Sequence, residues 1–179
     1  LGHLGCTPDA LEAWDRAAAL RPGEAAPARA ATGLLQAAGR ADQALAASER
    51  WVALAPEEAA AHHARGILLD QAGRLDEGIA ALERAGRLAP GHADLHYDLG
   101  RALRRAHRDQ SAIAAFREAV RLEPGHAEAL SGLGALLWQA KNSAMALEAF
   151  RRAVAARPDH PVVLTRYANA LHAFGRQDE

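Results

Sequence analysis

Residues 93–126 read ADLHYDLGRALRRAHRDQSAIAAFREAVRLEPGH, and two helical patterns follow each other within this segment. The apolar positions are Leu95, Leu99 and Leu103 in the first pattern, and Ile113, Phe116 and Val120 in the second. Spacings of three and four residues place each set on one face of a helix, which predicts helices over about 93–107 and 111–122. Pro124 cannot donate to a helical hydrogen-bond ladder, so the second helix is expected to end before it.

The same organisation repeats along the chain with a period of 34 residues, the distance from Pro22 to Pro56. The recurring prolines are Pro22, Pro56, Pro90, Pro124 and Pro158. Other columns keep the step, namely Gly66, Gly100 and Gly134, then Ala85, Ala119 and Ala153, and also Phe116 and Phe150. One column holds glycine at Gly5, Gly39, Gly73 and Gly175, and His107 and Lys141 in the copies between. One helix pair cannot bury its own apolar face, so several pairs are expected to stack in series.

The composition agrees with packed helices. The 179 residues are 50% hydrophobic but only 4% aromatic, so the core is built from small side chains, which suit close helix packing better than a sheet. A formal net charge of −1 argues against general attraction to nucleic acid or to a membrane surface. Cys6 is the single cysteine, which excludes an internal disulfide. No apolar run approaches the roughly 20 residues of a membrane-spanning helix.

The copy at 93–126 resembles the tetratricopeptide repeat, whose pattern places Leu-Gly in the first helix, then alanine and phenylalanine, then alanine and proline. The matching residues are Leu99, Gly100, Ala112, Phe116, Ala119 and Pro124, followed in the next copy by Leu133, Gly134, Ala146, Phe150, Ala153 and Pro158. The copies at 59–92 and 25–58 match more loosely. The resemblance implies an all-α fold, an α-solenoid of antiparallel helix hairpins that forms a right-handed superhelix.

We therefore treat the chain as one solenoid domain divided at the repeat boundaries. Complete repeats are expected at 25–58, 59–92, 93–126 and 127–160. Residues 1–24 are expected to supply the second helix of a partial repeat, and residues 161–179 the first helix of another. The last helix would lack cover for Leu164, Tyr167 and Leu171, which favours self-association through the open solenoid ends. Light scattering across a range of concentrations tests that reading.

In this family the first helices line the concave face on which ligand peptides lie, so the resemblance implies a peptide-binding groove. The residues expected in it are His63, Tyr97, Arg101, Arg104, Ser131, Trp138, Arg166 and Asn169. Arginine forks bind carboxylates and aromatic faces anchor planar or apolar side chains, so the expected partner is a protein or an extended peptide with acidic character. The alternative is that these are solvated residues on an exposed helix face. The carboxylate-clamp arrangement of lysines and asparagines seen in chaperone-binding members is absent, so a chaperone C-terminal tail is not favoured.

The first interpretation of the function is a protein–protein interaction scaffold without catalysis in this fragment. The second is a substrate-recruiting arm of a larger transferase, because bacterial relatives of this kind often precede glycosyltransferases or sulfotransferases. The sequence carries no phosphate-binding glycine loop, no nucleophile elbow and no dinucleotide fingerprint, so no cofactor is expected. Nucleic acid is not favoured, because aspartates are interleaved with the arginines around Arg101 and Arg108. A lone thiol fits a reducing cytoplasm, but the localisation stays open.

Two further observations concern the histidines and the large side chain of Trp51. His92 and His96 are four residues apart, which is a metal-binding spacing, yet His92, His126 and His160 occupy equivalent turns about one repeat apart, too far to share an ion. No metal site is therefore expected.

Trp51 stands in a column of alanines, and Ser48 stands where later copies have phenylalanine. We expect the indole to fill the volume that the serine leaves empty.

Overall fold

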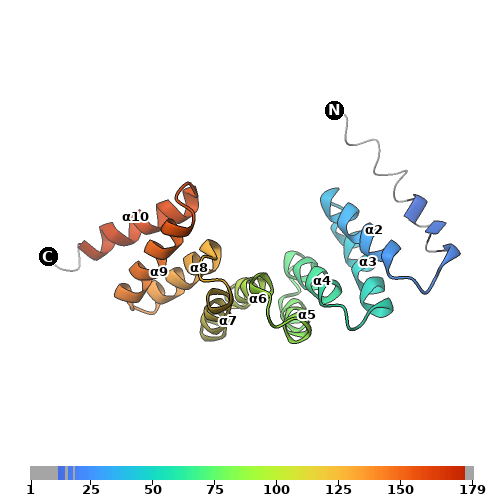
Figure 1. Ribbon diagram of the computed structural model, residues 1–179, viewed down its shortest axis with the longest axis horizontal. Helices are drawn as coiled ribbons and strands as arrows, with labels where there is room; N and C mark the ends of the chain where they lie inside the picture. The colour runs from blue at the N-terminus through green and yellow to red at the C-terminus, as the bar shows by residue number, and fades with distance from the viewer. Residues whose placement is uncertain (1–11, 15, 18, 176–179) are drawn as a thin grey trace, which may run out of the picture. The chain divides into compact units, whose positions relative to one another are not determined.

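The computed structural model describes residues 12–14, 16, 17 and 19–175, and all regular secondary structure within these residues is helical. The features noted at Gly5 and Cys6 lie outside the described residues. Contacts divide the chain into two compact units, one that ends at Pro90 and one that begins at Gly91. Each unit is built from helices that pack against their neighbours in sequence, so the architecture is the expected all-α series of helix pairs (Figure 1).

Of the long helices that the described residues form, four lie in the first unit and five in the second. Those of the first unit are α2 (Ala26–Ala37), α3 (Ala41–Leu54), α4 (Ala59–Gln71) and α5 (Leu75–Leu88). Those of the second are α6 (Ala93–Arg105), α7 (Asp109–Leu122), α8 (Ala127–Gln139), α9 (Ser143–Ala156) and α10 (Pro161–Gly175). In the second unit α8 also contacts both α6 and α10, so three first-of-pair helices lie next to one another. This row of helices positions the candidate site.

The second helix of each pair ends two residues before the recurring proline. The residue between them leaves the helical region, with φ −137° and ψ 68° at Ala55 and φ −137° and ψ 69° at Ala89. A residue that precedes proline is disfavoured in the helical region because the ring crowds its backbone. The prolines therefore set the end of each pair, as the sequence predicted.

The first helix of each pair ends in a left-handed residue that closes a Schellman turn. Gly39 and Gly73 have φ values of 70° and 78°, and His107 and Lys141 have 57° and 62°. The next N–H donates back to the carbonyl five residues earlier, as from Asn142 to Leu137 at 2.9 Å. The sequence placed the end of the first helix of 93–126 near His107. The helix ends at Arg105 because the turn takes up the following residues.

Lys141→Gly is expected to stabilise the second unit by about 0.5–1 kcal/mol, because a left-handed conformation strains any residue with a Cβ. The Lys141 side chain is exposed, so little packing is lost. Urea denaturation followed by circular dichroism measures the change. The matched control is Ala140→Gly one position earlier, where φ is −76°. There glycine only adds backbone freedom and should destabilise by about 0.5–1 kcal/mol. Stabilisation by both substitutions would contradict this account.

Small residues let the helices of a pair approach, and one large side chain fills the remaining space. A Cβ placed on Gly100 would lie 2.7 Å from Phe116 Cδ1, and one placed on Gly132 would lie 2.8 Å from Phe116 Cζ. Phe116 is therefore held between the backbones of α6 and α8, and its side chain is only 1% exposed. Phe150 lies against Gly134 in the same way, with the nearest ring atom at 2.9 Å from a Cβ placed there.

The indole of Trp51 is buried, at 5% exposure. It packs in one cluster with Ala28 and Ala61, and its Nε1–H donates to Glu58 Oε2 at 2.8 Å. Ala28 occupies the column that begins the family pattern with tryptophan, so Trp51 supplies the bulk that Ala28 lacks. In the same copy Thr32 takes the glycine column, and the side chains of Thr32 and Ser48 are both buried.

Candidate functional site

The residues expected to form the groove fall on four helices. His63 lies half-buried on α4 in the first unit. The others lie in the second unit, with Tyr97, Arg101 and Arg104 on α6, Ser131 and Trp138 on α8, and Arg166 and Asn169 on α10. These seven residues line two clefts that share Arg166. The structure therefore brings together all of the expected residues of the second unit, and their role in binding stays a prediction.

The first cleft, here called the arginine cleft, has a volume of about 220 Å³. Its polar lining consists of Tyr97, Arg101, Arg104, Glu128, Ser131, His160 and Arg166. Three arginines thus face one carboxylate, that of Glu128, and Glu128 forms an ion pair with Arg157. The arginine cleft therefore carries an excess of positive charge.

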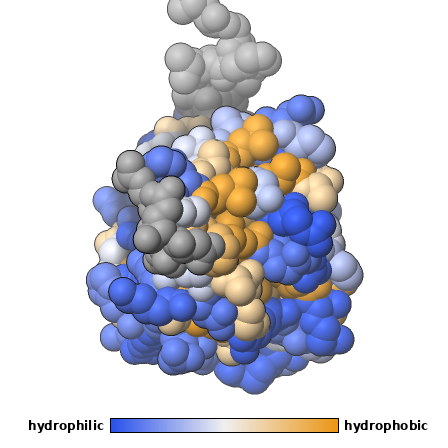
Figure 2. All heavy atoms as spheres, turned by 90° about the vertical axis from the view of Figure 1, so that its left-hand side faces the viewer, coloured by the Kyte–Doolittle hydropathy of each residue, from blue (hydrophilic) through white to orange (hydrophobic). Residues whose placement is uncertain are grey.

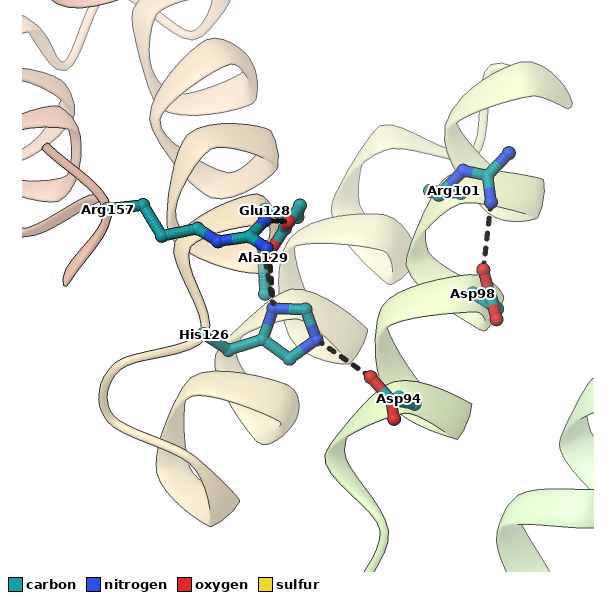
Figure 3. Close-up of polar contacts among 7 residues, drawn as sticks. All are labelled: Asp94, Asp98, Arg101, His126, Glu128, Ala129 and Arg157. Carbon is teal, nitrogen blue, oxygen red and sulfur yellow. Dashed lines mark hydrogen bonds and ion pairs between the residues drawn. The ribbon is translucent and has the colours of Figure 1, made fainter. Parts of the chain in front are cut away.

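The three arginines of this cleft differ in how they are engaged. Arg101 donates from Nη1 to Asp98 Oδ1 at 2.9 Å (Figure 3). Its guanidinium carbon lies 5.7 Å from the centroid of the Tyr97 ring. Arg166 donates from Nη1 to Ser131 Oγ at 2.9 Å. Among the described residues, neither Arg104 nor Arg166 forms an ion pair with a carboxylate. Arg104 and Arg166 are therefore the groups with positive charge to offer a ligand.

The environment of Arg166 is unfavourable to its charge. Burial lowers the pKa of the Arg166 guanidinium, and the positive charge of Arg104 lowers this pKa further. Like charges repel each other more strongly in a partly buried cleft than in open solvent, because less water is present to screen them. An anionic group placed between the two arginines would relieve that repulsion, so the cleft is suited to bind a carboxylate.

Ser131 lines the arginine cleft beneath a side chain of α10. Its side chain is buried, at 3% exposure, and its hydroxyl accepts the hydrogen bond from Arg166. The hydrogen bond to Ser131 therefore fixes the position of the Arg166 guanidinium. The sequence placed Ser131 on the correct helix face but could not show that a side chain from α10, 35 residues away, would cover it.

Tyr97 forms an aromatic wall of the cleft. Its ring centroid lies 6.1 Å from that of Phe116 and 4.9 Å from that of His126. Burial raises the pKa of the Tyr97 phenol above its usual value, and the nearby charge of Arg101 opposes that rise. The phenol therefore stays neutral at physiological pH and adds no negative charge to the cleft.

His126 has a structural role that was not predicted from the sequence, where it was identified only as part of a turn between repeats. Its Nδ1 accepts a hydrogen bond from the Ala129 N–H at 3.3 Å and so caps α8 (Figure 3). That acceptor role places the ring proton on Nε2, which donates to Asp94 Oδ1 at 3.3 Å. His126 thereby ties α6 to the start of α8. The signal for it was present, because His92, His126 and His160 recur with the repeat period.

The second cleft, here called the tryptophan cleft, has a volume of about 390 Å³ and a mostly apolar lining. The residues around it are Ala135, Trp138, Phe150, Arg166, Asn169, Ala170 and Ala173. Three alanines leave space beside two aromatic rings, and the exposed amide of Asn169 lies at the edge. A cleft of this kind suits a planar or bulky apolar side chain with a peptide backbone passing over it.

The face of the second unit that α9 and α10 present also carries apolar side chains (Figure 2). On α10, Leu164 is 40% exposed, Leu171 is 47% exposed and Val162 is 51% exposed. Leu164 and Leu171 are two of the residues for which self-association was expected, and that expectation stays a prediction. Among the described residues, no cluster of three or more His, Cys, Asp and Glu side chains could hold a metal ion. No described helix has the length and apolar character needed to cross a membrane.

Comparison with known proteins assigns the class. The paired helices and the recurring small residues define a helical-repeat protein, and the profile of the tetratricopeptide repeat matches residues 30–93, 63–124 and 97–161. These overlapping matches cover most of the sequence, so the chain belongs to the tetratricopeptide repeat family. A search of curated proteins finds no significant match.

Solved structures share the fold at low sequence identity. A fragment of MamA from Desulfovibrio magneticus RS-1 has a TM-score of 0.79 and 21% identity, over 88% of this chain and 89% of that one. YrrB, described as having an unusual peptide-binding site, has a TM-score of 0.78 and 22% identity, over 92% of this chain and 85% of that one. The first repeat domain of RPAP3, bound to an HSP90 peptide, has a TM-score of 0.63 and 19% identity, over 66% of this chain and 94% of that one.

Proposed function

We propose that this chain is a protein-interaction scaffold whose second unit binds an extended, acidic protein segment, with no catalytic step at the binding site. The observation that carries the proposal is the pair Arg104 and Arg166, which share one cleft and pair with no carboxylate among the described residues. Peptide binding by YrrB and by RPAP3 supports the proposal, because both have this fold. Arg101 has a smaller part in it, because Asp98 already neutralises its charge.

Arg104 and Arg166 together are expected to select acidic peptides. A library of random peptides displayed on phage, panned against the purified chain, should become enriched in aspartate and glutamate. The double variant Arg104→Ala/Arg166→Ala should bind the selected peptides about 100-fold more weakly or worse, because it removes two charge-assisted hydrogen bonds that each contribute roughly 1.5–3 kcal/mol. Binding to the unaltered chain should weaken as the salt concentration rises, since ions screen exposed charges.

The matched control is Arg117→Ala/Arg152→Ala, which removes the same charge from two exposed arginines outside the clefts. This variant should bind the selected peptides as well as the unaltered chain does. Circular dichroism should show that both double variants keep their helices. A selected pool without acidic enrichment, or equal binding by the two double variants, would remove the proposal.

A further inference from the structure

We infer that the preferred ligand segment has polyproline II conformation and carries an acidic side chain and an aromatic side chain three residues apart. This inference rests on the proposed function and specifies it. The acidic side chain would bind between Arg104 and Arg166 in the arginine cleft. The aromatic side chain would bind in the tryptophan cleft, beside Trp138.

The two clefts are consecutive sites along one helix. Val162, Val163 and Arg166 of α10 line the arginine cleft, and Arg166, Asn169, Ala170 and Ala173 line the tryptophan cleft. The helical residues of the two clefts are thus centred about six positions apart. At a rise of about 1.5 Å per residue, this separation is about 9 Å. A ligand that fills both clefts must therefore present two anchoring side chains about 9 Å apart.

That separation selects one backbone conformation. In a polyproline II helix, side chains three residues apart lie on the same side, about 9 Å from each other. In a β-strand, side chains on one side are about 7 Å or about 13 Å apart, at two and four residues. Of these two extended conformations, only polyproline II has a spacing that agrees with the separation of the clefts. Such a segment also loses little conformational entropy on binding, because its backbone is already extended.

The chemistry of the two clefts requires different side chains. The arginine cleft has guanidinium groups in excess over carboxylates, which complements an acidic group. The tryptophan cleft has two aromatic rings and three alanines, which complement a planar apolar side chain. The guanidinium of Arg166 belongs to both clefts, so it can contact the carboxylate and lie beside the aromatic ring together. The exposed amide of Asn169 is placed to bond the backbone between the anchors.

Fluorescein-labelled peptides with Gly-Ser flanks test the spacing by fluorescence anisotropy. The series is Glu-Pro-Phe, Glu-Pro-Pro-Phe and Glu-Pro-Pro-Pro-Phe, with the reversed Phe-Pro-Pro-Glu to cover the opposite chain direction. The two-proline spacing, in one of its two directions, should bind about tenfold more tightly than either other spacing, the effect expected when one anchor is lost. Glu-Pro-Pro-Gly and Gln-Pro-Pro-Phe, which each lack one anchor, should also bind about tenfold more weakly.

Two variants probe the tryptophan cleft in different ways. Trp138→Ala removes the aromatic wall, and Ala173→Leu fills the cleft without removing any contact of the core. Either should reduce the affinity for Glu-Pro-Pro-Phe about tenfold and leave that for Glu-Pro-Pro-Gly unchanged, because only the aromatic anchor is affected. Ala173→Leu keeps the test decisive if Trp138→Ala fails to fold.

The outcomes separate this inference from the proposed function. Equal affinity at all spacings, with binding abolished in Arg104→Ala/Arg166→Ala, would overturn the two-anchor inference and leave acidic-segment binding in place. Failure of every glutamate peptide to bind would overturn both. Tighter binding of a single-stranded oligouridylate, whose phosphates and bases could also occupy arginine and aromatic sites, would overturn both in favour of RNA.

Discussion

Trp51→Ala is expected to lower the free energy of unfolding of the first unit by about 3–5 kcal/mol, the range for truncating a buried large aromatic side chain. The Trp51 side chain is 5% exposed and packs with Ala28 and Ala61, which are too small to close the resulting cavity. The substitution also leaves Glu58 without its hydrogen bond from the indole. Urea denaturation followed by circular dichroism measures the loss, and hydrogen exchange of the amides in α2 and α4 locates it.

A second substitution tests where the missing volume lies. Ala28→Leu should recover about 1–2 kcal/mol in the Trp51→Ala chain, because the longer side chain extends into the cavity. In the unaltered chain the same change should destabilise, since the indole already occupies that space. A loss below about 1 kcal/mol for Trp51→Ala would show that the ring is not a core residue. Destabilisation by Ala28→Leu in both chains would show that the cavity lies elsewhere.

Phe116→Ala is expected to destabilise the second unit by about 3–5 kcal/mol and to reverse the sign of a neighbouring substitution. Gly100→Ala alone should destabilise by about 1–3 kcal/mol, because the three nearest atoms to its added Cβ all belong to Phe116. In the Phe116→Ala chain that obstacle is gone. There Gly100→Ala should stabilise by up to about 1 kcal/mol, since alanine is the better helix former.

The four chains of this cycle can be compared by urea denaturation monitored by circular dichroism. Gly33→Ala in α2 is the control, because nothing lies within 4 Å of a Cβ added there and φ is not positive. It should stabilise by about 0.5–1 kcal/mol regardless of Phe116. Independent effects of Gly100→Ala and Phe116→Ala would contradict the packing account. The first copy already shows the exchange, with Thr32 in the glycine column and Ser48 in the phenylalanine column.

The helix pairs were predictable because each copy repeats the residues that end its two helices. The pre-proline residues end the second helices, and the left-handed residue in the glycine column ends the first ones, so the boundaries follow from single columns. The compensation around Trp51 was predicted only in part. The sequence indicated that Trp51 fills space in the core, but its packing against Ala28 and Ala61 depends on contacts between helices.

The residues of the candidate site could be selected from helix periodicity, because first-of-pair helices expose equivalent faces. Their grouping into two clefts could not, because it depends on which side chains from neighbouring helices meet. Arg101 looked equal to Arg104 in the sequence, yet Asp98 pairs with Arg101. Arg166 is held by Ser131 from another helix, a contact that no spacing within one repeat encodes. Local pattern therefore identified the surface, and tertiary contacts determined which of its charges are available.

The left-handed turn residue Lys141 also determines where lysine modification can act on this chain. The sequence holds no other lysine, so the cations of the arginine cleft are all guanidinium groups and carry no amine to acylate. Acetylation of this chain's lysine would therefore change a turn between α8 and α9 and leave the charge of the cleft intact. The Lys141 amine is therefore a single side-chain handle for attaching a dye or a surface linker at a residue outside the lining of both clefts.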